Sequence, residues 1–530
     1  MYFCKRVTFN TKTDIMQNLP IGMQSFEAVR KANYLYVDKT KHLERLVTTN
    51  KYYFLSRPRR FGKSLFLSTL KAYFLGKKEL FKGLYIEKVE KQWTEYPVLY
   101  LDMNSGIYDS EERLLNSLNY HLSEWEKQYN IQTKFVNPED RLSNIIKTAV
   151  KQTGKQVVVL VDEYDKPLLQ TIDNEELHDK FKGILKGVYS VLKGCDEYIR
   201  FGMLTGVTKF SKISLFSDLN NLMDISLDEN YTDICGITEE EIKTNFKEHL
   251  QAFAEKESTT KEDILSQLKA MYDGYHFSEN ISIDIYNPFS FLNSLTERKF
   301  RNYWFQTGTP TFLIKLLKEN DYDLKDFSEG NIDAVDLTSK ESMLNAPIAL
   351  FYQSGYLTIK DYDRDFSSYV LGYPNREVEQ SFLDFLLPKY INTEENMSTS
   401  FLIAFARDLR AGRIEDFLTK LKVFFAKTPY DLIKDTENHY QTVVFIICKL
   451  LGYYSEAEYK IVNGRIDMVI KTKDYIYVFE FKFDKSAKEA LEQIDSKDYP
   501  LAFQQDERKL YKIGVNFSSQ TKNIDEYIIQ

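Results

Sequence analysis

The sequence predicts an α/β protein, and three observations indicate this fold class. Short apolar runs, typical of buried strands, recur in the first half at 52–55, 98–101, 157–161 and 201–204. Helical patterns separate these runs, and strands that alternate with helices form parallel sheets covered on both faces. After residue 438 an apolar helix precedes two β-runs, an amphipathic helix and a closing strand, which predicts a second, smaller α/β domain.

Length and composition indicate a folded protein of several domains. The chain has 530 residues, of which 43% are hydrophobic and 28% charged. A prior of about 150 residues per domain therefore gives roughly three or four domains, each with its own core. The net charge of -8 argues against coating of nucleic acid by bulk attraction, so any such contact is expected in a local basic cleft.

Cysteine usage and hydropathy indicate in which cellular compartment the protein is expected. The four cysteines show neither metal-binding spacing nor a disulfide framework, which fits a reducing compartment: they are Cys4, Cys195, Cys235 and Cys448. No apolar run approaches the roughly 18 residues that span a bilayer, and residues 1–15 lack the apolar core of a signal peptide. We expect a cytoplasmic protein without a membrane partner, and we assign residues 1–15 no role.

Changes of pattern predict four regions. Residues 16–236 hold the parallel sheet, and acidic helix-rich segments such as EEEIKTNFKEHLQAFAEK predict a helical lid over 237–335. A helix, two strand-like runs (YLTIKDY and SSYVLGY) and another helix would suit a small winged-helix module at 336–400. The last α/β domain takes 401–530.

A phosphate-binding loop is predicted after the first strand. The strand YYFLS runs into Arg57-Pro-Arg-Arg-Phe-Gly-Lys-Ser64 and then into a helix, the order that a P-loop requires. Backbone N–H groups of such a loop attract phosphate oxygens, Lys63 neutralises the β and γ charges, Ser64 offers a hydroxyl to Mg²⁺, and Gly62 permits close approach. The loop departs from GxxxxGK[ST], because Arg57 stands where the first glycine belongs.

Neighbouring residues complete the predicted ATP site. Phe61, inside the motif, and Leu65, directly after it, are expected to contact the nucleotide. Arg59 and Arg60 would help to bind phosphate, act on a neighbouring subunit, or remain solvated charges, and the sequence leaves these alternatives open.

Carboxylates follow the third apolar run. The run 157–161 ends in Asp162 and Glu163, so Asp162 is expected in the Mg²⁺ shell and Glu163 is expected to polarise the attacking water. The fourth run ends in Thr205, which would orient that water or contact the γ-phosphate, with a plain turn as the alternative.

The C-terminal β-runs predict a second site. If the turn at Lys473 and Asp474 is symmetric, Asp467 and Glu480 are cross-strand neighbours. Lys482 lies on the same face as Glu480, because side chains two residues apart on a strand point the same way. Two carboxylates and an ammonium can bind Mg²⁺, lower the pKa of a bound water and support hydrolysis of a phosphodiester.

Two helical residues are added to this site with less support. Glu437 would approach as an outer metal ligand, and Gln493 would orient Lys482 or a phosphate. The plainer alternatives are a polar helix surface for these two and an exposed hairpin of alternating charges for the rest.

The chain resembles a family in which an AAA-type ATPase-like domain is joined to a C-terminal PD-(D/E)XK nuclease-superfamily domain. The motifs that carry the resemblance are IGMQSFEAVRKANYLYVDKT, RPRRFGKS, VVVLVDEYDKPL, TGVTKFSKISLFSDLNNL, YDGYHF, YNPFSFLN, YWFQTGTP, QSGYLTI, GRID and FEFK. The resemblance implies Mg-ATP binding around Gly62, Lys63, Ser64 and Asp162. It also implies metal-dependent cleavage by Asp467, Glu480 and Lys482.

Three functions are compatible with these patterns. The first is an ATP-regulated or ATP-driven nuclease that acts on nucleic acid, expected to be DNA. The second is a nucleotide switch whose C-terminal domain holds nucleic acid or a partner without cutting, although an acidic pair beside Lys482 would repel phosphate. The third is a self-inhibited ATPase that forms a homo-oligomer.

Overall fold

The computed structural model describes residues 16–530 apart from the gaps 133, 210–220, 306–331, 335–336, 338–347, 392–394, 427–435, 456–457, 463–465, 497–502 and 504–505. The side chains of some further residues, Glu437 and Asp467 among them, also lie outside the description. The chain divides into two compact units. The first comprises 1–307 and 330–375, and the second comprises 308–329 and 376–530.

A five-stranded parallel sheet forms the centre of the first unit, as the sequence predicts. Its order is β2-β3-β4-β1-β5, and every neighbouring pair is parallel. The four predicted strands are confirmed, and β5 is a short addition at the edge. The strands are β1 Tyr52–Ser56, β2 Val98–Asp102, β3 Val157–Asp162, β4 Ile199–Gly206 and β5 Leu222–Asp224.

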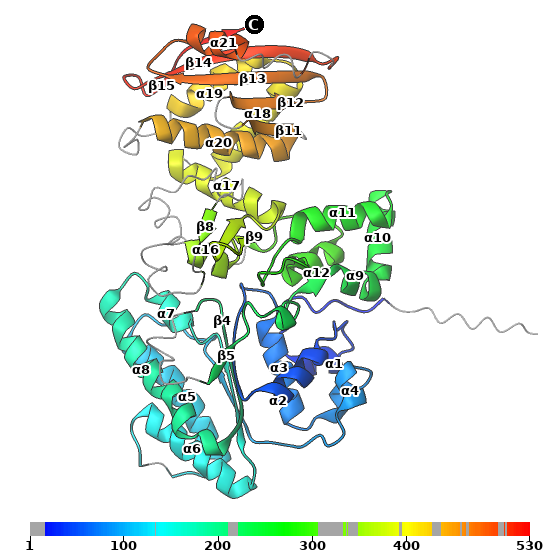
Figure 1. The fold of residues 1–530 in the computed structure, drawn as a ribbon, viewed down its shortest axis with the longest axis vertical. Helices are drawn as coiled ribbons and strands as arrows, with labels where there is room; N and C mark the ends of the chain where they lie inside the picture. The colour runs from blue at the N-terminus through cyan, green and yellow to red at the C-terminus, as the bar shows by residue number, and fades with distance from the viewer. Residues whose placement is uncertain are drawn as a thin grey trace, which may run out of the picture. The chain divides into compact units, whose positions relative to one another are not determined.

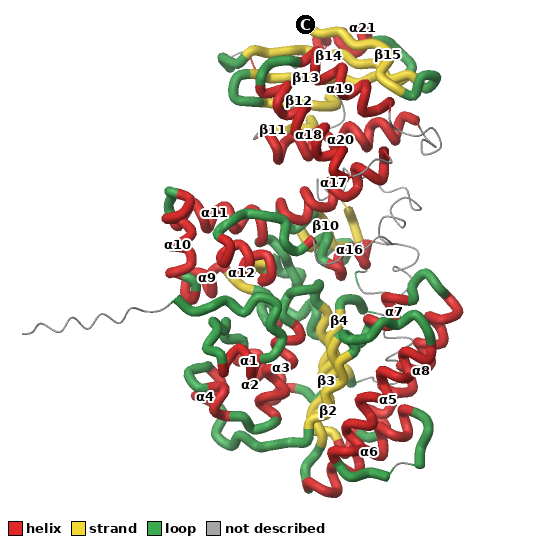
Figure 2. The backbone as a smooth tube through the Cα atoms, turned by 180° about the vertical axis from the view of Figure 1, so that it is seen from behind, coloured by secondary structure: helices red, strands yellow, loops and turns green. Residues whose placement is uncertain are grey.

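Helices cover both faces of this sheet (Figures 1 and 2). One group, shown to one side of the strands in Figure 2, comprises α1 Phe26–Lys31, α2 Thr40–Thr49, α3 Lys63–Phe74, η1 Lys78–Phe81 and α4 Tyr85–Val89. The other comprises α5 Glu111–Gln128, α6 Pro138–Thr153, α7 Lys166–Gln170 and α8 Glu175–Gly194. The helical patterns expected between the predicted strands are thus present, α3 and α5 among them. Short turns η2 Asp196–Tyr198 and η3 Glu229–Tyr231 complete the region.

The alternation of β3 decides which way its last residue points. Val157, Val159 and Val161 belong to the core that also contains buried leucines of α5 and α8. Successive side chains of a strand point to opposite faces, so Asp162 faces the α3 side. The apolar sequence of β3 therefore carries a carboxylate to the side of the sheet on which the phosphate-loop helix begins.

Helices dominate the next part of the first unit, as expected. Two of them begin with capping boxes, Thr238 with Glu241 and Thr260 with Asp263, in which side chains satisfy backbone N–H groups that a helix start leaves unpaired. The elements are β6 Ile237–Thr238, α9 Glu239–Asn245, α10 Lys247–Glu257, α11 Lys261–Tyr272, β7 Ile285–Tyr286 and α12 Pro288–Glu297.

The expected helix and two strands follow in the rest of the first unit. They are α16 Ile348–Ser354, β9 Thr358–Asp363 and β10 Ser368–Gly372, and β8 Ile332–Ala334 joins them in an antiparallel sheet of order β8-β10-β9. The boundary between the two units falls between Asn375 and Arg376, inside the segment for which a winged-helix module is predicted. That module, like the four domain boundaries, stays a prediction.

Among its described residues, the second unit packs a mixed five-stranded sheet with four helices that precede it in the sequence and a fifth that lies between its third and fourth strands. Its strand order is β11-β12-β13-β14-β15, and β13 and β14 are parallel while the other pairs are antiparallel. The four preceding helices are α17 Arg376–Ile391, α18 Glu395–Arg410, α19 Ile414–Ala426 and α20 Thr436–Ser455. The sheet region consists of β11 Glu458–Val462, β12 Ile466–Lys471, β13 Tyr475–Phe483, α21 Ala487–Ser496, β14 Lys509–Ser518 and β15 Asn523–Ile529. Two strands, rather than the single one expected, follow the last helix.

In the part of the chain that the structure describes, no helix has the length and apolar character needed to cross a membrane.

Candidate functional site

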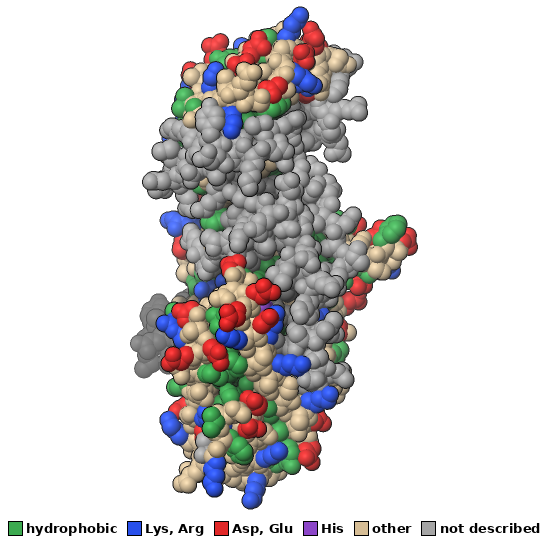
Figure 3. All heavy atoms as spheres, turned by 90° about the vertical axis from the view of Figure 1, so that its left-hand side faces the viewer, with side chains coloured by type: hydrophobic (Ala, Val, Ile, Leu, Met, Phe, Trp, Pro, Cys, Tyr) green, Lys and Arg blue, Asp and Glu red, His purple; other side chains and the backbone are tan. Residues whose placement is uncertain are grey.

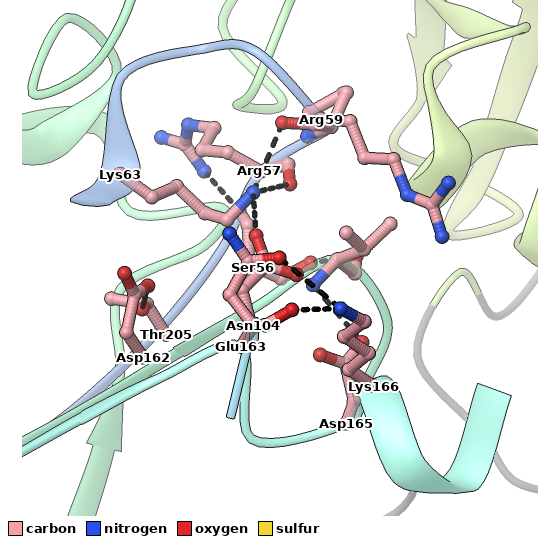
Figure 4. A network of polar contacts seen from close by, with 12 residues as sticks. Ser56, Arg57, Arg59, Lys63, Asn104, Asp162, Glu163, Asp165, Lys166 and Thr205 are labelled. Atoms are coloured by element: carbon pink, nitrogen blue, oxygen red, sulfur yellow. Dashed lines mark hydrogen bonds and ion pairs between the residues drawn. The ribbon is translucent and has the colours of Figure 1, made fainter. Parts of the chain in front are cut away.

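The loop after β1 places Lys63 at the start of α3. Gly62 caps the helix with φ of 98°, a left-handed conformation that strains residues with a side chain. The Lys63 ammonium is buried and donates to the carbonyls of Arg57 and Pro58, at 2.9 and 3.1 Å. Its Nζ also lies 3.7 Å from Oε1 of Glu163 (Figure 4). The lysine therefore points across the loop toward the end of β3.

Arg57 stands where the first glycine of the P-loop motif belongs, and its side chain is directed into the domain. Its guanidinium is buried, with the residue 1% exposed. It donates to the carbonyls of Ser56, Ser226 and Tyr231 at 2.9, 2.7 and 3.0 Å and lies 4.1 Å from the ring centre of Phe277. Burial lowers its pKa. The Arg57 side chain therefore anchors the loop to the interior of the domain.

Phe61 is a structural anchor as well. It is fully buried, its ring meets those of Tyr275 and Phe277 edge-on at 4.8 and 5.5 Å, and its carbonyl accepts the backbone N–H of Gly236 at 3.0 Å. The loop is thereby fixed to the helical part of the unit.

The two loop arginines do not meet Lys63. Arg59 and Arg60 are both exposed, and Figure 4 shows the Arg59 guanidinium directed away from Lys63. Arg60, with φ of 68°, stacks over Phe289 at 5.1 Å. Ser64 and Leu65 are partly buried. Of the predicted loop residues, Lys63 alone contacts the Asp162–Glu163 turn through an ion pair among those described.

Asp162 is held by residues of both neighbouring strands. Its Oδ1 accepts the Thr205 hydroxyl at 2.7 Å and its Oδ2 accepts the Tyr100 hydroxyl at 3.2 Å. Asp102, at the end of β2, is its partner in the strand register. Thr205 is fully buried, so its hydroxyl orients Asp162 in this structure, and a contact to water or phosphate stays a prediction. Oxygen ligands from Ser64 and Asp162 suit Mg²⁺.

The second site lies on β13. Glu480 is buried, at 2% exposure, and its Oε1 accepts the Lys482 ammonium at 2.9 Å. The same ammonium donates to Oε1 of Gln493 on α21 at 2.6 Å. Strand alternation places Phe479 on the other face, where it is fully buried. The structure thus brings Glu480, Lys482 and Gln493 together.

The strand register agrees with the predicted turn. The printed pairs of β12 and β13 run from Lys471 with Ile476 to Met468 with Phe479, so the next position in this register pairs Asp467 with Glu480. The side chains of Asp467 and Glu437 lie outside the described residues. Within the described set, no three His, Cys, Asp or Glu side chains form a group that could hold a metal. Glu480 by itself offers the carboxylate oxygen that Mg²⁺ prefers.

Comparisons with known proteins give a family match for the region that contains Lys63 and another for the region that contains Lys482. Residues 20–216 match the model of a predicted AAA-ATPase domain, and residues 435–527 match the PD-(D/E)XK nuclease superfamily. A protein of Azotobacter chroococcum mcd 1, described as an uncharacterized protein in the vnfD 5′ region, is 35% identical over 536 residues, which cover 97% of this chain and 99% of that one.

The chain belongs to the AAA-ATPase-like family with a C-terminal PD-(D/E)XK domain. Among solved structures, the ORC2 protein of Aeropyrum pernix in ADPNP-ADP complexes is similar at 13% identity, with coverage of 66% of this chain and 88% of that one. Its TM-score of 0.23 supports no conclusion. Lys63, Asp162, Glu163 and Thr205 fall within the AAA-ATPase-like match.

Sequence reasoning missed Asp165 in the AAA-ATPase-like domain. This fully buried carboxylate accepts the backbone N–H groups of Val207 and Thr208, at 3.0 and 2.6 Å, and the Thr208 hydroxyl at 2.7 Å. Burial, and then the charge of Glu163, raise its pKa to about 6. The second aspartate of DEYD was a usable signal, because a carboxylate just past a buried strand faces the loop of the next strand.

Sequence reasoning also missed an apolar cavity beside the phosphate loop. Its volume is about 90 Å³. Segments that are far apart in the sequence, from Pro20 to Leu292, contribute its lining, which includes Tyr36, Val37, Phe61, Leu65, Ile237 and Phe246. Apolar walls next to a phosphate loop suit a flat aromatic base. No local pattern signals such a cavity, because its walls meet only in the folded chain.

Proposed function

We propose that this protein binds and hydrolyses Mg-ATP in its first unit and cleaves phosphodiester bonds, in DNA, with its second, the nucleotide state controlling cutting. The observation that carries the proposal is the pair of lysine–carboxylate contacts. Lys63 lies 3.7 Å from Glu163, and Lys482 lies 2.9 Å from Glu480. Each contact belongs to a domain of an ATPase-like or nuclease superfamily.

The residues of the first site suit ATP hydrolysis. Two of the Lys63 contacts are to loop carbonyls, which phosphate oxygens would replace as stronger, charge-assisted acceptors. Bound Mg²⁺ would compensate triphosphate charge between Ser64 and Asp162. Once Lys63 turns to phosphate, the carboxylate of Glu163 is available to accept a proton from the attacking water.

The cavity supports a nucleoside triphosphate over a bare phosphate ligand. Gly62, Leu65 and Phe66 line it and also belong to the start of α3. A base held against these apolar walls leaves its phosphates at the helix N-terminus, where backbone N–H groups attract anions.

The residues of the second site suit phosphodiester hydrolysis. A divalent ion bound by Glu480 and Asp467 would lower the pKa of a bound water. Lys482 would then orient that water or balance charge on the phosphate, and Gln493 fixes the position of the ammonium. Acidic and basic side chains are interspersed on the face in Figure 3, and the net charge is -8, so DNA is expected to bind locally.

The ATP half is tested by calorimetry and phosphate release with Mg-ATP. Lys63→Ala should weaken ATP binding and should lower the rate of ATP hydrolysis by about 100-fold or more. The substitution removes the main positive charge that would contact the phosphates. Lys78→Ala, at an exposed position beyond the same helix, is the matched control and should resemble the wild type. Equal ATP affinity in Lys63→Ala would refute the proposed site.

The nuclease half is tested by incubating linear DNA and RNA with Mg²⁺ or Mn²⁺. Cleavage should require the metal and should be lost in Lys482→Ala but retained in Lys488→Ala, whose side chain is exposed on α21. Wild-type protein that turns over ATP yet cuts no nucleic acid would instead support the switch without cleavage.

A further inference from the structure

The end of β4 and the loop that follows it, together residues 205–209, are tied to the turn after β3. Tyr164 donates its backbone N–H to the Thr205 carbonyl at 3.0 Å and its hydroxyl to the Thr208 carbonyl at 3.0 Å. Asp165 accepts from Val207 and Thr208. This loop and the Asp162–Glu163 turn thus form one hydrogen-bonded unit at the phosphate site.

The other end of the loop is held by a residue outside the parallel-sheet region. The backbone N–H of Lys209 donates to Oε1 of Gln353 at 3.0 Å. Gln353 lies on α16, is 5% exposed, and donates its own Nε2 to the Leu337 carbonyl at 2.7 Å. Both ends of its amide are therefore engaged, which fixes the acceptor that faces Lys209.

The end of the same helix contacts the phosphate loop. Gly355, with φ of 90°, comes so close to Pro58 that an added Cβ would lie 2.7 Å from the Pro58 Cβ. The Gly355 carbonyl also accepts the Tyr275 hydroxyl at 3.2 Å. The region around α16 therefore contacts both loops that frame Lys63 and Glu163.

We infer that Gln353 is a positioning residue for ATP hydrolysis: through the backbone of Lys209 it holds loop 205–209, and with it Thr205 and Asp162, in the geometry for turnover. The inference rests on the proposed ATPase function. It links Gln353 of α16 to the catalytic loop, because a shift of Gln353 would break its hydrogen bond to the Lys209 backbone, although the Lys209 ammonium keeps its ion pair with Asp224 of β5.

Removal of the acceptor is expected to act on kcat and not on KM. The described hydrogen bonds of the Gln353 side chain go to Lys209 and Leu337, and Gln353 is not among the residues that line the cavity beside the phosphate loop, so ATP affinity should persist. Leaving the partly buried backbone N–H of Lys209 without an acceptor costs free energy, and the loop should move so that this N–H finds another acceptor. Thr205 would then hold Asp162 less well.

The experiment compares three variants of the full chain in Mg-ATP turnover, with hydrogen exchange of the Lys209 amide as a second readout. Gln353→Met keeps the side-chain size but removes the amide, Gln353→Glu keeps an acceptor, and Tyr352→Phe removes a hydroxyl from the same helix. For Gln353→Met we expect a fall in kcat of about tenfold, a KM within about twofold, and faster exchange at Lys209. Gln353→Glu keeps the acceptor for Lys209 but loses the donor to the Leu337 carbonyl, so it should recover part of kcat, and Tyr352→Phe should match the wild type.

Two outcomes would overturn the inference. One is unchanged kcat in Gln353→Met although Lys209 exchanges faster. The other is an equal loss in Tyr352→Phe, which would assign the effect to the helix as a whole. If Gln353→Met does not fold, Gln353→Glu and Gln353→Asn carry the comparison, since Asn is too short to reach Lys209 and Glu is not. Wild-type protein without ATP turnover would reject the proposed function itself, so the two failures are distinct.

Discussion

The two lysine–carboxylate sites are built in different ways. In the first, Lys63, Tyr100, Asp162, Glu163 and Thr205 come from four segments that meet only in the folded sheet. In the second, Glu480 and Lys482 share one strand and Gln493 follows on the next helix. Tertiary packing therefore fixes the first geometry, and strand alternation with one loop fixes the second. Loss of the long-range support from Gln353 should consequently lower activity at the first site more than loss of Gln493 lowers it at the second.

The largest effect is expected at the water-polarising residue of the first site. Glu163→Gln should lower kcat for ATP by about 100- to 1000-fold, because an amide cannot accept the proton of the attacking water. Mg-ATP binding should persist, because in this variant Lys63 has no ion pair with residue 163 to break before it contacts the phosphates. Turnover and calorimetric titration measure the two quantities, with Glu197→Gln, at an exposed position, as control. Wild-type kcat in Glu163→Gln would remove the role assigned to that residue.

A large effect on stability is expected at the supporting carboxylate of the first site. The pKa of Asp165 is raised from an ordinary value of 3.8 to about 6, so the folded chain keeps this proton to higher pH than the unfolded chain does. Stability therefore falls as pH rises from about 4 to about 6, and the loss is complete above that window. One pKa unit is worth about 1.4 kcal/mol, so ionised Asp165 costs the folded state about 3 kcal/mol.

Asp165→Asn should remove this cost, because its amide oxygen still accepts from Val207 and Thr208. Its free energy of unfolding should exceed that of the wild type by about 3 kcal/mol at pH 7.5 and match it near pH 4. Urea unfolding at the two pH values measures the difference. An equal difference at both would show that the charge of Asp165 is not the cause.

A smaller effect is expected from the supporting residue of the second site. Gln493→Ala removes one acceptor of the Lys482 ammonium, and Glu480 still holds it. Loss of one such hydrogen bond is worth about 1 kcal/mol, or about fivefold in cleavage rate. Initial rates of DNA cleavage at saturating Mg²⁺ measure it. A loss as large as that in Lys482→Ala would erase the contrast between the sites and make Gln493 essential.

The smallest effect is expected at Tyr100. Tyr100→Phe removes a 3.2 Å hydrogen bond to Asp162, which keeps its shorter bond from Thr205. We expect an increase of about threefold in the Mg²⁺ concentration needed for half-maximal ATP turnover, from a loss below about 1 kcal/mol. Thr205→Val should give a larger increase. The reverse order would mean that Tyr100 is the main support of Asp162.

The sequence predicted those features that depend on local pattern. Alternation and a short turn gave the register of β12 with β13, because a two-residue period leaves one pairing that keeps the same faces together. The apolar run of β3 likewise brought Asp162 to the end of a buried strand. Those predictions needed only neighbouring residues.

Features made by distant contacts escaped sequence reasoning. The sequence leaves three roles open for Arg59 and Arg60. The structure directs the Arg59 guanidinium away from Lys63 and places that of Arg60 over Phe289, and the choice among those roles stays a prediction. The burial of Arg57 depends on carbonyls near 226 and 231. The cavity is lined by several segments that lie between residues 20 and 292. None of these contacts produces a periodic pattern of residues that could be recognised in the sequence.

The measurement that tests the central claim most directly is cleavage of circular DNA with Mg²⁺, with and without ATP, by wild type, Lys63→Ala and Lys482→Ala. We predict that ATP changes the wild-type cleavage rate, that Lys63→Ala cuts at a rate independent of ATP, and that Lys482→Ala cuts under neither condition. Cleavage by the wild type that ignores ATP, or cleavage that survives Lys482→Ala, would contradict a nucleotide-controlled nuclease built on these two lysines.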